Sequence, residues 1–179
     1  MKTVNYDRAT RYLHWLMAII IIYATCAGYA MHLVIDSHPN IFQFLSVLNM
    51  SLATIGSIAF IIRWIWKYFR PVKSFNEKGI PQWQSSLAHL IHSVIYQLML
   101  VVFISGFLML ETSYELFWLI TIPNPITSPD INSFFFTVHR ISCAALALVV
   151  LLHASAALKH HFVTKNLVLK RMLGQAKVI

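Results

Sequence analysis

Charged residues are scarce in this chain. Only 11% of its 179 residues are charged and 58% are hydrophobic, whereas about 25% are charged in a typical soluble domain. The chain has too little charge to cover its own surface in water. Its composition therefore indicates a membrane protein whose main partner is the lipid bilayer.

Glycine, cysteine and acidic residues are also rare, and their absence excludes several kinds of site. The five glycines form neither a phosphate-binding loop nor a dinucleotide fingerprint. Cys26 and Cys143 lie in apolar segments and there is no Cys-x-x-Cys-His motif, which excludes a disulfide framework, a zinc knuckle and a c-type haem. The apolar segments contain no Asp or Glu, which argues against a haem-free metal transporter.

Four apolar stretches are long enough to cross a bilayer, which takes roughly 20 residues of helix. They cover residues 12–34, 41–66, 87–110 and 134–158. The first has a basic flank like a signal peptide, but its apolar run is too long and lacks a clear cleavage site. The pattern predicts an all-α fold, a four-helix transmembrane bundle that forms one domain over residues 1–179.

The basic residues lie on one side of these predicted spans. Thirteen of the fourteen Lys and Arg residues flank the first span, link spans two and three, or follow span four; Arg140 is the exception. The positive-inside rule then places both termini and the middle link in the cytoplasm. The net charge of +8 reflects this topology, and no nucleic-acid partner is expected.

The longest outer segment, residues 111–133, carries three prolines, Pro123, Pro125 and Pro129. Proline removes a helical hydrogen bond and clashes with the preceding turn. We therefore expect no continuous helix in this loop.

Two histidines stand out in the fourth apolar stretch. His139 and His153 are fourteen residues apart, which corresponds to about 21 Å along a helix and to within roughly 40° of the same face. Both are expected to face the bundle, one in each leaflet, where ionisable residues are usually functional. A haem b with two histidine ligands suits neutral imidazoles in an apolar pocket, and interhelical hydrogen bonding is the alternative.

The remaining histidines are sorted by depth. His14, His89, His92 and His153 all lie in the inner half, so depth alone leaves the first three open as partners of His153. His89 and His92, three residues apart, suit an interhelical contact or a substrate site equally well. Three further histidines are expected to be solvated at the boundaries: His32, His38 and His161.

Three segments resemble the bacterial cytochrome b561 family: YDRATRYLHW near the start, AHLIHSVIY in span three and VLLHASAALKHHF at the end of span four. Superoxide oxidase is one member of that family, and the cytochrome b subunits of hydrogenases are more distantly similar. The resemblance covers nearly the whole chain. It implies a membrane haem b protein that transfers electrons to or from the ubiquinone pool.

The resemblance also implies roles for individual residues. His14 and His153 would bind an inner-leaflet haem b, and His139 an outer-leaflet haem. His92 and His160 would help to form a ubiquinone site at the cytoplasmic side.

The sequence departs from the family pattern at the outer haem. The second ligand of that haem would fall on Asn49, and an amide is a poor haem ligand. Met50 is adjacent but turned by about 100° on a helix. Without a second haem, the Asn49 amide is the expected hydrogen-bond partner of His139.

Two functions are consistent with these features. The first is a superoxide:quinone oxidoreductase, although the outer loops are acidic apart from Arg140 and an anion is steered by positive potential. The second is a haem-containing membrane anchor or electron carrier for a soluble periplasmic redox protein.

Overall fold

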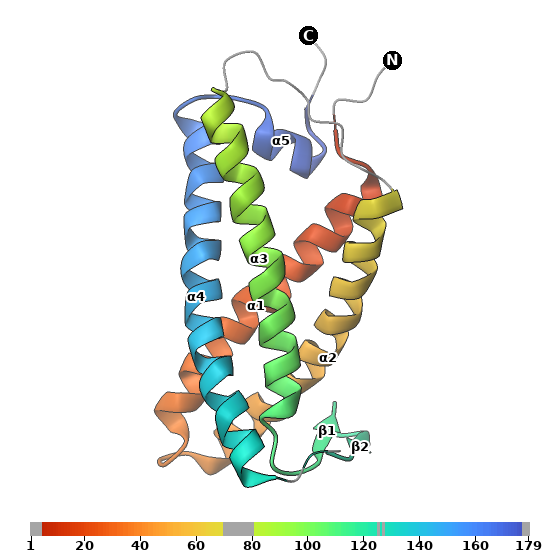
Figure 1. Ribbon diagram of the computed structural model, residues 1–179, viewed down its shortest axis with the longest axis vertical. Coiled ribbons are helices and arrows are strands. Elements are labelled where there is room, and N and C mark those ends of the chain that lie inside the picture. The colour runs from red at the N-terminus through yellow and green to blue at the C-terminus, as the bar shows by residue number, and fades with distance from the viewer. Residues whose placement is uncertain (1–4, 70–80, 125, 127, 177–179) are drawn as a thin grey trace.

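The computed structural model describes residues 5–69, 81–124, 126 and 128–176. It contains four long helices (Figure 1): α1 (Arg8–Val34), α2 (Pro39–Phe69), α3 (Gln82–Leu108) and α4 (Pro129–Phe162). A short helix, α5 (Val168–Leu173), follows α4. All four long helices are long and apolar enough to cross a membrane, which confirms the predicted spans.

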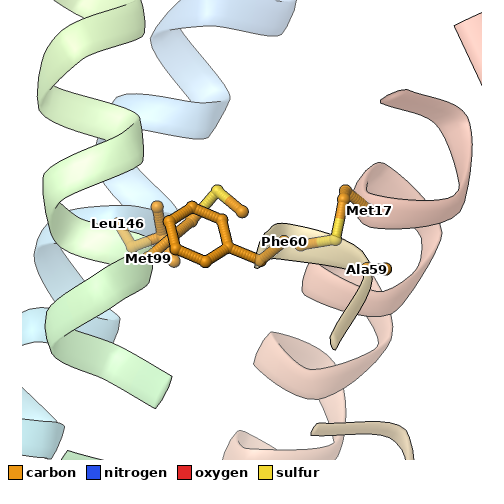
Figure 2. Close-up of a cluster of buried hydrophobic side chains, with 5 residues drawn as sticks. All are labelled: Met17, Ala59, Phe60, Met99 and Leu146. Atoms are coloured by element: carbon orange, nitrogen blue, oxygen red, sulfur yellow. The ribbon is translucent and has the colours of Figure 1, made fainter. Parts of the chain in front are cut away.

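The four helices associate as two pairs. The backbones of α1 and α2 approach each other closely, as do those of α3 and α4, whereas contact between the pairs depends largely on long side chains. Figure 2 shows the ring of Phe60 on α2 reaching toward Met99 and Leu146 on the other pair. Phe60 is only 2% exposed, so this cluster forms the core between the two pairs.

Close approach within the first pair depends on a glycine. A Cβ atom added at Gly56 of α2 would lie 3.1 Å from Ile20 Cγ2 on α1 and 3.3 Å from Phe103 Cζ on α3. Lipid is as apolar as leucine, so helices in membranes associate through tight packing at small residues. Gly56 is therefore a contact point for three helices.

The polar ends of the spans are held by side chains. Asp7 caps α1 by accepting hydrogen bonds from the Thr10 amide at 2.9 Å and the Thr10 hydroxyl at 2.6 Å. Partial burial would raise the pKa of the Asp7 carboxyl, but hydrogen bonds from Thr10 and the Trp66 side chain lower it overall. At the opposite end of the bundle, Asn132 of α4 is 1% exposed and donates to the carbonyls of Leu108 and Leu110 at 2.8 and 2.7 Å.

A small hairpin lies at the end of the bundle opposite the start of α1 and helix α5 (Figure 1). Strands β1 (Tyr114–Leu116) and β2 (Ile120–Ile122) are antiparallel. The fully buried Ser51 hydroxyl of α2 accepts a 2.7 Å hydrogen bond from the amide of Phe117 in the turn. The expected absence of a continuous helix is confirmed here, although the sequence did not predict the strands.

The start of α1 and helix α5 lie at the opposite end (Figure 1). Asn5 and Ala176 exchange two hydrogen bonds of 3.1 and 3.0 Å, and the Trp15 indole donates to the Met172 carbonyl at 3.3 Å. We call this the basic end, because the flanking Lys and Arg residues gather there, and we call the other the hairpin end. Four spans place both termini on one side of the membrane.

The orientation of the bundle is open to a labelling test. The positive-inside rule places the basic end in the cytoplasm. Leu119, in the turn of the hairpin, is 84% exposed. In a background without Cys26 and Cys143, a Leu119→Cys variant should react with an impermeant maleimide in intact cells. A Gln175→Cys variant should react only after the cells are permeabilised, and the reverse pattern would invert the orientation.

Candidate functional site

Three histidines from both helix pairs meet in the half of the bundle near the basic end. The ring centroids of His14 on α1 and His153 on α4 are 6.4 Å apart, and the rings are inclined by 66°. His92 on α3 lies 5.0 Å from His153 in an edge-to-face contact. These ring contacts place two of the three sequence candidates, His14 and His92, next to His153.

An arginine and a tyrosine complete this histidine cluster. Arg63 on α2 places Nη2 3.3 Å from His14 Nδ1, and its Nε donates to the Tyr96 hydroxyl at 2.9 Å. The third guanidinium nitrogen, Nη1, is buried without a hydrogen-bond partner. All four long helices therefore contribute to the cluster.

Sequence reasoning missed the role of Arg63, which was counted only among the charges that set the topology. The available signal was its position inside the predicted span 41–66. A charged side chain within a membrane span is expensive and is by default a candidate functional residue.

His139 lies in the other half of the bundle and packs directly on α3. Its Nδ1 is 3.1 Å from the Val102 carbonyl and 3.2 Å from the Ser105 hydroxyl. Its Nε2 is 3.3 Å from Cys143 Sγ. A Cβ atom added at Gly106 would lie 3.1 Å from the His139 ring, so the glycine permits this contact.

Asn49 does not partner His139 as expected from the sequence. The hydrogen bonds of His139 go to α3 and to its own helix instead, because the ring lies against Gly106. Asn49 Oδ1 is buried without a hydrogen-bond partner, and the neighbouring Met50 is buried.

The other histidines are placed at the two ends. His160 Nδ1 accepts from the Asn166 amide at 2.7 Å and lies 3.2 Å from Thr164 Oγ1, so it joins the end of α4 to the start of α5. His32 and His38 are exposed as expected. The expectation for His161 is wrong in part, because its Nδ1 is buried without a partner.

The sequence matches the model of the prokaryotic cytochrome b561 family over residues 5–175. The chain belongs to this family. It is 25% identical over 167 residues to cytochrome b561 homolog 2 of Escherichia coli (strain K12), covering 91% of this chain and 88% of that protein. The prokaryotic cytochrome b561 family supports a multi-pass bacterial membrane protein with haem b and a role in electron transfer.

The histidine cluster fits the haem b that cytochrome b561 implies. A metal–imidazole bond is about 2 Å long and the nitrogen lies about 1 Å from the ring centre, so two axial imidazoles have centroids about 6 Å apart. The 6.4 Å of His14 and His153 matches this spacing, whereas the 5.0 Å of His92 and His153 is too short. Among the described residues no group of three His, Cys, Asp or Glu is placed to hold a metal ion, but a haem iron needs only two from the protein.

The hairpin end does not fit a second haem with two histidine ligands. In the described part of the chain, His139 bonds to α3 through Nδ1 and lies 3.3 Å from Cys143 Sγ through Nε2, and its ring lies against Gly106. Its contacts include no other histidine, and His32 and His38 are exposed.

Proposed function

We propose that this protein transfers single electrons between one haem b and the quinone pool, and that His14 and His153 would hold the haem iron. The observation that carries the proposal is the 6.4 Å pair of imidazoles that joins the two helix pairs. The haem, when bound, supplies the one-electron chemistry. The protein supplies two nitrogen lone pairs and fixes the rings.

The residues around the two ligands hold them in place. His92 lies edge-to-face on His153, and Arg63 lies beside His14. Partners around metal ligands fix their tautomer and orientation and tune the metal. The ligands therefore sit in a frame to which α2 and α3 contribute, although neither helix provides a ligand.

A quinone site at the basic end is the second part of the proposal. A quinone takes up protons together with electrons, so it needs groups that donate hydrogen bonds and carry protons. His92 is next to an iron ligand, and His160 lies two helical turns further toward the basic end. We assign His92 and His160 to hydrogen bonds and proton transfer at the quinone oxygens.

Two electron donors are candidates at the hairpin end: superoxide and a soluble periplasmic redox protein. The described charges outside the spans at this end are mostly acidic: Asp36, Glu111, Glu115 and Asp130. Arg140 on α4 packs over the Phe136 ring, with Cζ 5.6 Å from its centroid. An acidic surface does not attract an anion, which favours the redox protein. Rapid reduction of the haem by superoxide would instead favour the oxidase.

The ligand assignment is tested by a His153→Ala variant. Removing one axial imidazole should lower haem content at least about tenfold and abolish the low-spin spectrum. His89→Ala is the matched control, because His89 is an exposed histidine and its loss should leave the spectrum unchanged. A His153→Ala protein with full haem content and an intact low-spin spectrum would refute the assignment.

The number of haems is tested at Asn49. Wild-type protein should contain about one haem per chain, and Asn49→His should raise the ratio toward about two by adding an imidazole at the family's ligand position. Pyridine haemochrome and protein assays give the ratio. Two low-spin haems in the wild type would contradict the proposal, and the loss of one of them in Met50→Leu would identify Met50 as a ligand.

The quinone site is tested by comparing His160→Ala with Asn166→Ala. Both variants break the 2.7 Å hydrogen bond between α4 and the link to α5, but only the first removes a proton-carrying group. His160→Ala should keep its haem and slow quinone reduction at least about tenfold, whereas Asn166→Ala should stay near the wild-type rate. Equal rates in the two variants would reduce His160 to a structural residue.

A further inference from the structure

Arg63 carries a guanidinium within a membrane span, and no carboxylate among the described residues pairs with it. In the described part of the chain its polar contacts are the Tyr96 hydroxyl and His14, both uncharged when His14 is neutral. Its Nη1 is buried without any partner. An uncompensated buried charge is costly, so the position calls for an anion.

When His14 binds iron, a second nitrogen of Arg63 loses its hydrogen-bond partner. Arginine only donates hydrogen bonds, so the 3.3 Å contact makes His14 Nδ1 an acceptor. A neutral imidazole has one nitrogen lone pair, and a metal ion that binds the ring takes it. Arg63 Nη2 then loses its acceptor and joins Nη1 as a donor without a partner.

Two free terminal nitrogens on one guanidinium form the fork that binds a carboxylate through two parallel hydrogen bonds. Nε remains engaged with Tyr96, which fixes the plane of the fork. Haem b carries two propionate carboxylates, and His14 lies directly beside the arginine. We propose that Arg63 binds a propionate of the haem held by His14 and His153 and raises the reduction potential of its iron.

This inference rests on the proposed haem at His14 and His153. The effect on potential follows from charge alone. Reduction of the iron adds one electron, and a fixed positive charge nearby stabilises the state that has gained it. The surroundings are apolar, so screening of this interaction is weaker than in water. Arg63 is therefore a positioning residue that acts on the iron through its charge and its hold on the haem.

Lys67 provides a matched control for the loss of one positive charge. It lies one helical turn from Arg63 on α2, and its Nζ is 5.0 Å from the centroid of the Tyr96 ring. Among the described residues, Lys67 therefore contacts Tyr96, which is also a partner of Arg63, and not His14. Lys67→Gln and Arg63→Gln remove the same charge at different distances from the ligand.

Redox titration of the purified haem-loaded protein gives the first measurement. Arg63→Gln should lower the ratio of reduced to oxidised haem at a fixed potential about tenfold, which corresponds to about 59 mV for a one-electron couple. Lys67→Gln should change the ratio less than about twofold. An unchanged potential in Arg63→Gln, or an equal shift in both variants, would overturn the proposed role.

Haem transfer to an excess of apomyoglobin gives a second measurement, which also serves if Arg63→Gln does not fold. Arg63→Lys keeps the charge but lacks the planar fork. It should keep the wild-type potential and release haem several-fold faster. An unchanged release rate in Arg63→Lys would contradict the propionate contact.

Reconstitution with haem dimethyl ester isolates the carboxylate. The ester carries no propionate charge, so wild type and Arg63→Gln should release it at similar rates, although they differ for natural haem; this comparison is a double-mutant cycle between protein and cofactor. An equal effect of the variant on both haems would exclude the propionate as the partner. Failure of the wild type to bind any haem, or full haem retention in His153→Ala, would instead refute the proposed function itself.

Discussion

The interior of this bundle offers no water to a polar group, and much of the structure follows from that constraint. A backbone or side-chain group that is buried in lipid or between the helices must find its partner in the protein. Asn132 meets the carbonyls after α3, Ser51 meets the amide of the hairpin turn, and His139 is bonded on both ring nitrogens. Against that background, the few buried groups without partners become informative. Arg63 Nη1 and Asn49 Oδ1 are among them.

The pairing of the helices decides where a cofactor can be held. Within each pair, small residues such as Gly56 and Gly106 let neighbouring helices touch. Between the pairs, contact depends on large side chains, with Phe60 at mid-height and the imidazoles of His14 and His153 nearer the basic end. Ligands that come from different pairs can also clamp those pairs together. The haem proposed here would therefore stabilise the bundle as well as transfer electrons.

Hydropathy predicted the four spans because a helix in lipid needs a long apolar run and little else. The depth of each histidine followed from the same spans, so the meeting of His14, His92 and His153 was within reach of the sequence. Rotation about the helix axis was not, because it is set by packing against neighbours. Sequence periodicity could not show that His89 is exposed, or that the Cys143 thiol and the Ser105 hydroxyl would surround His139. The hairpin was missed for a related reason: its strands are three residues long, and the turn is held by Ser51 from a distant helix.

The two histidines of α4 have different surroundings although one helix carries both. At the basic end, α4 faces His14 across the gap between the pairs, and an imidazole there meets another imidazole at 6.4 Å. At the hairpin end, Gly106 lets the ring of His139 lie against the α3 backbone. The Val102 carbonyl accepts a hydrogen bond from His139 Nδ1. A shared helix face therefore does not give two histidines the same partners. What distinguishes the two positions is the residue opposite, which is a histidine beside Arg63 in one case and a glycine in the other.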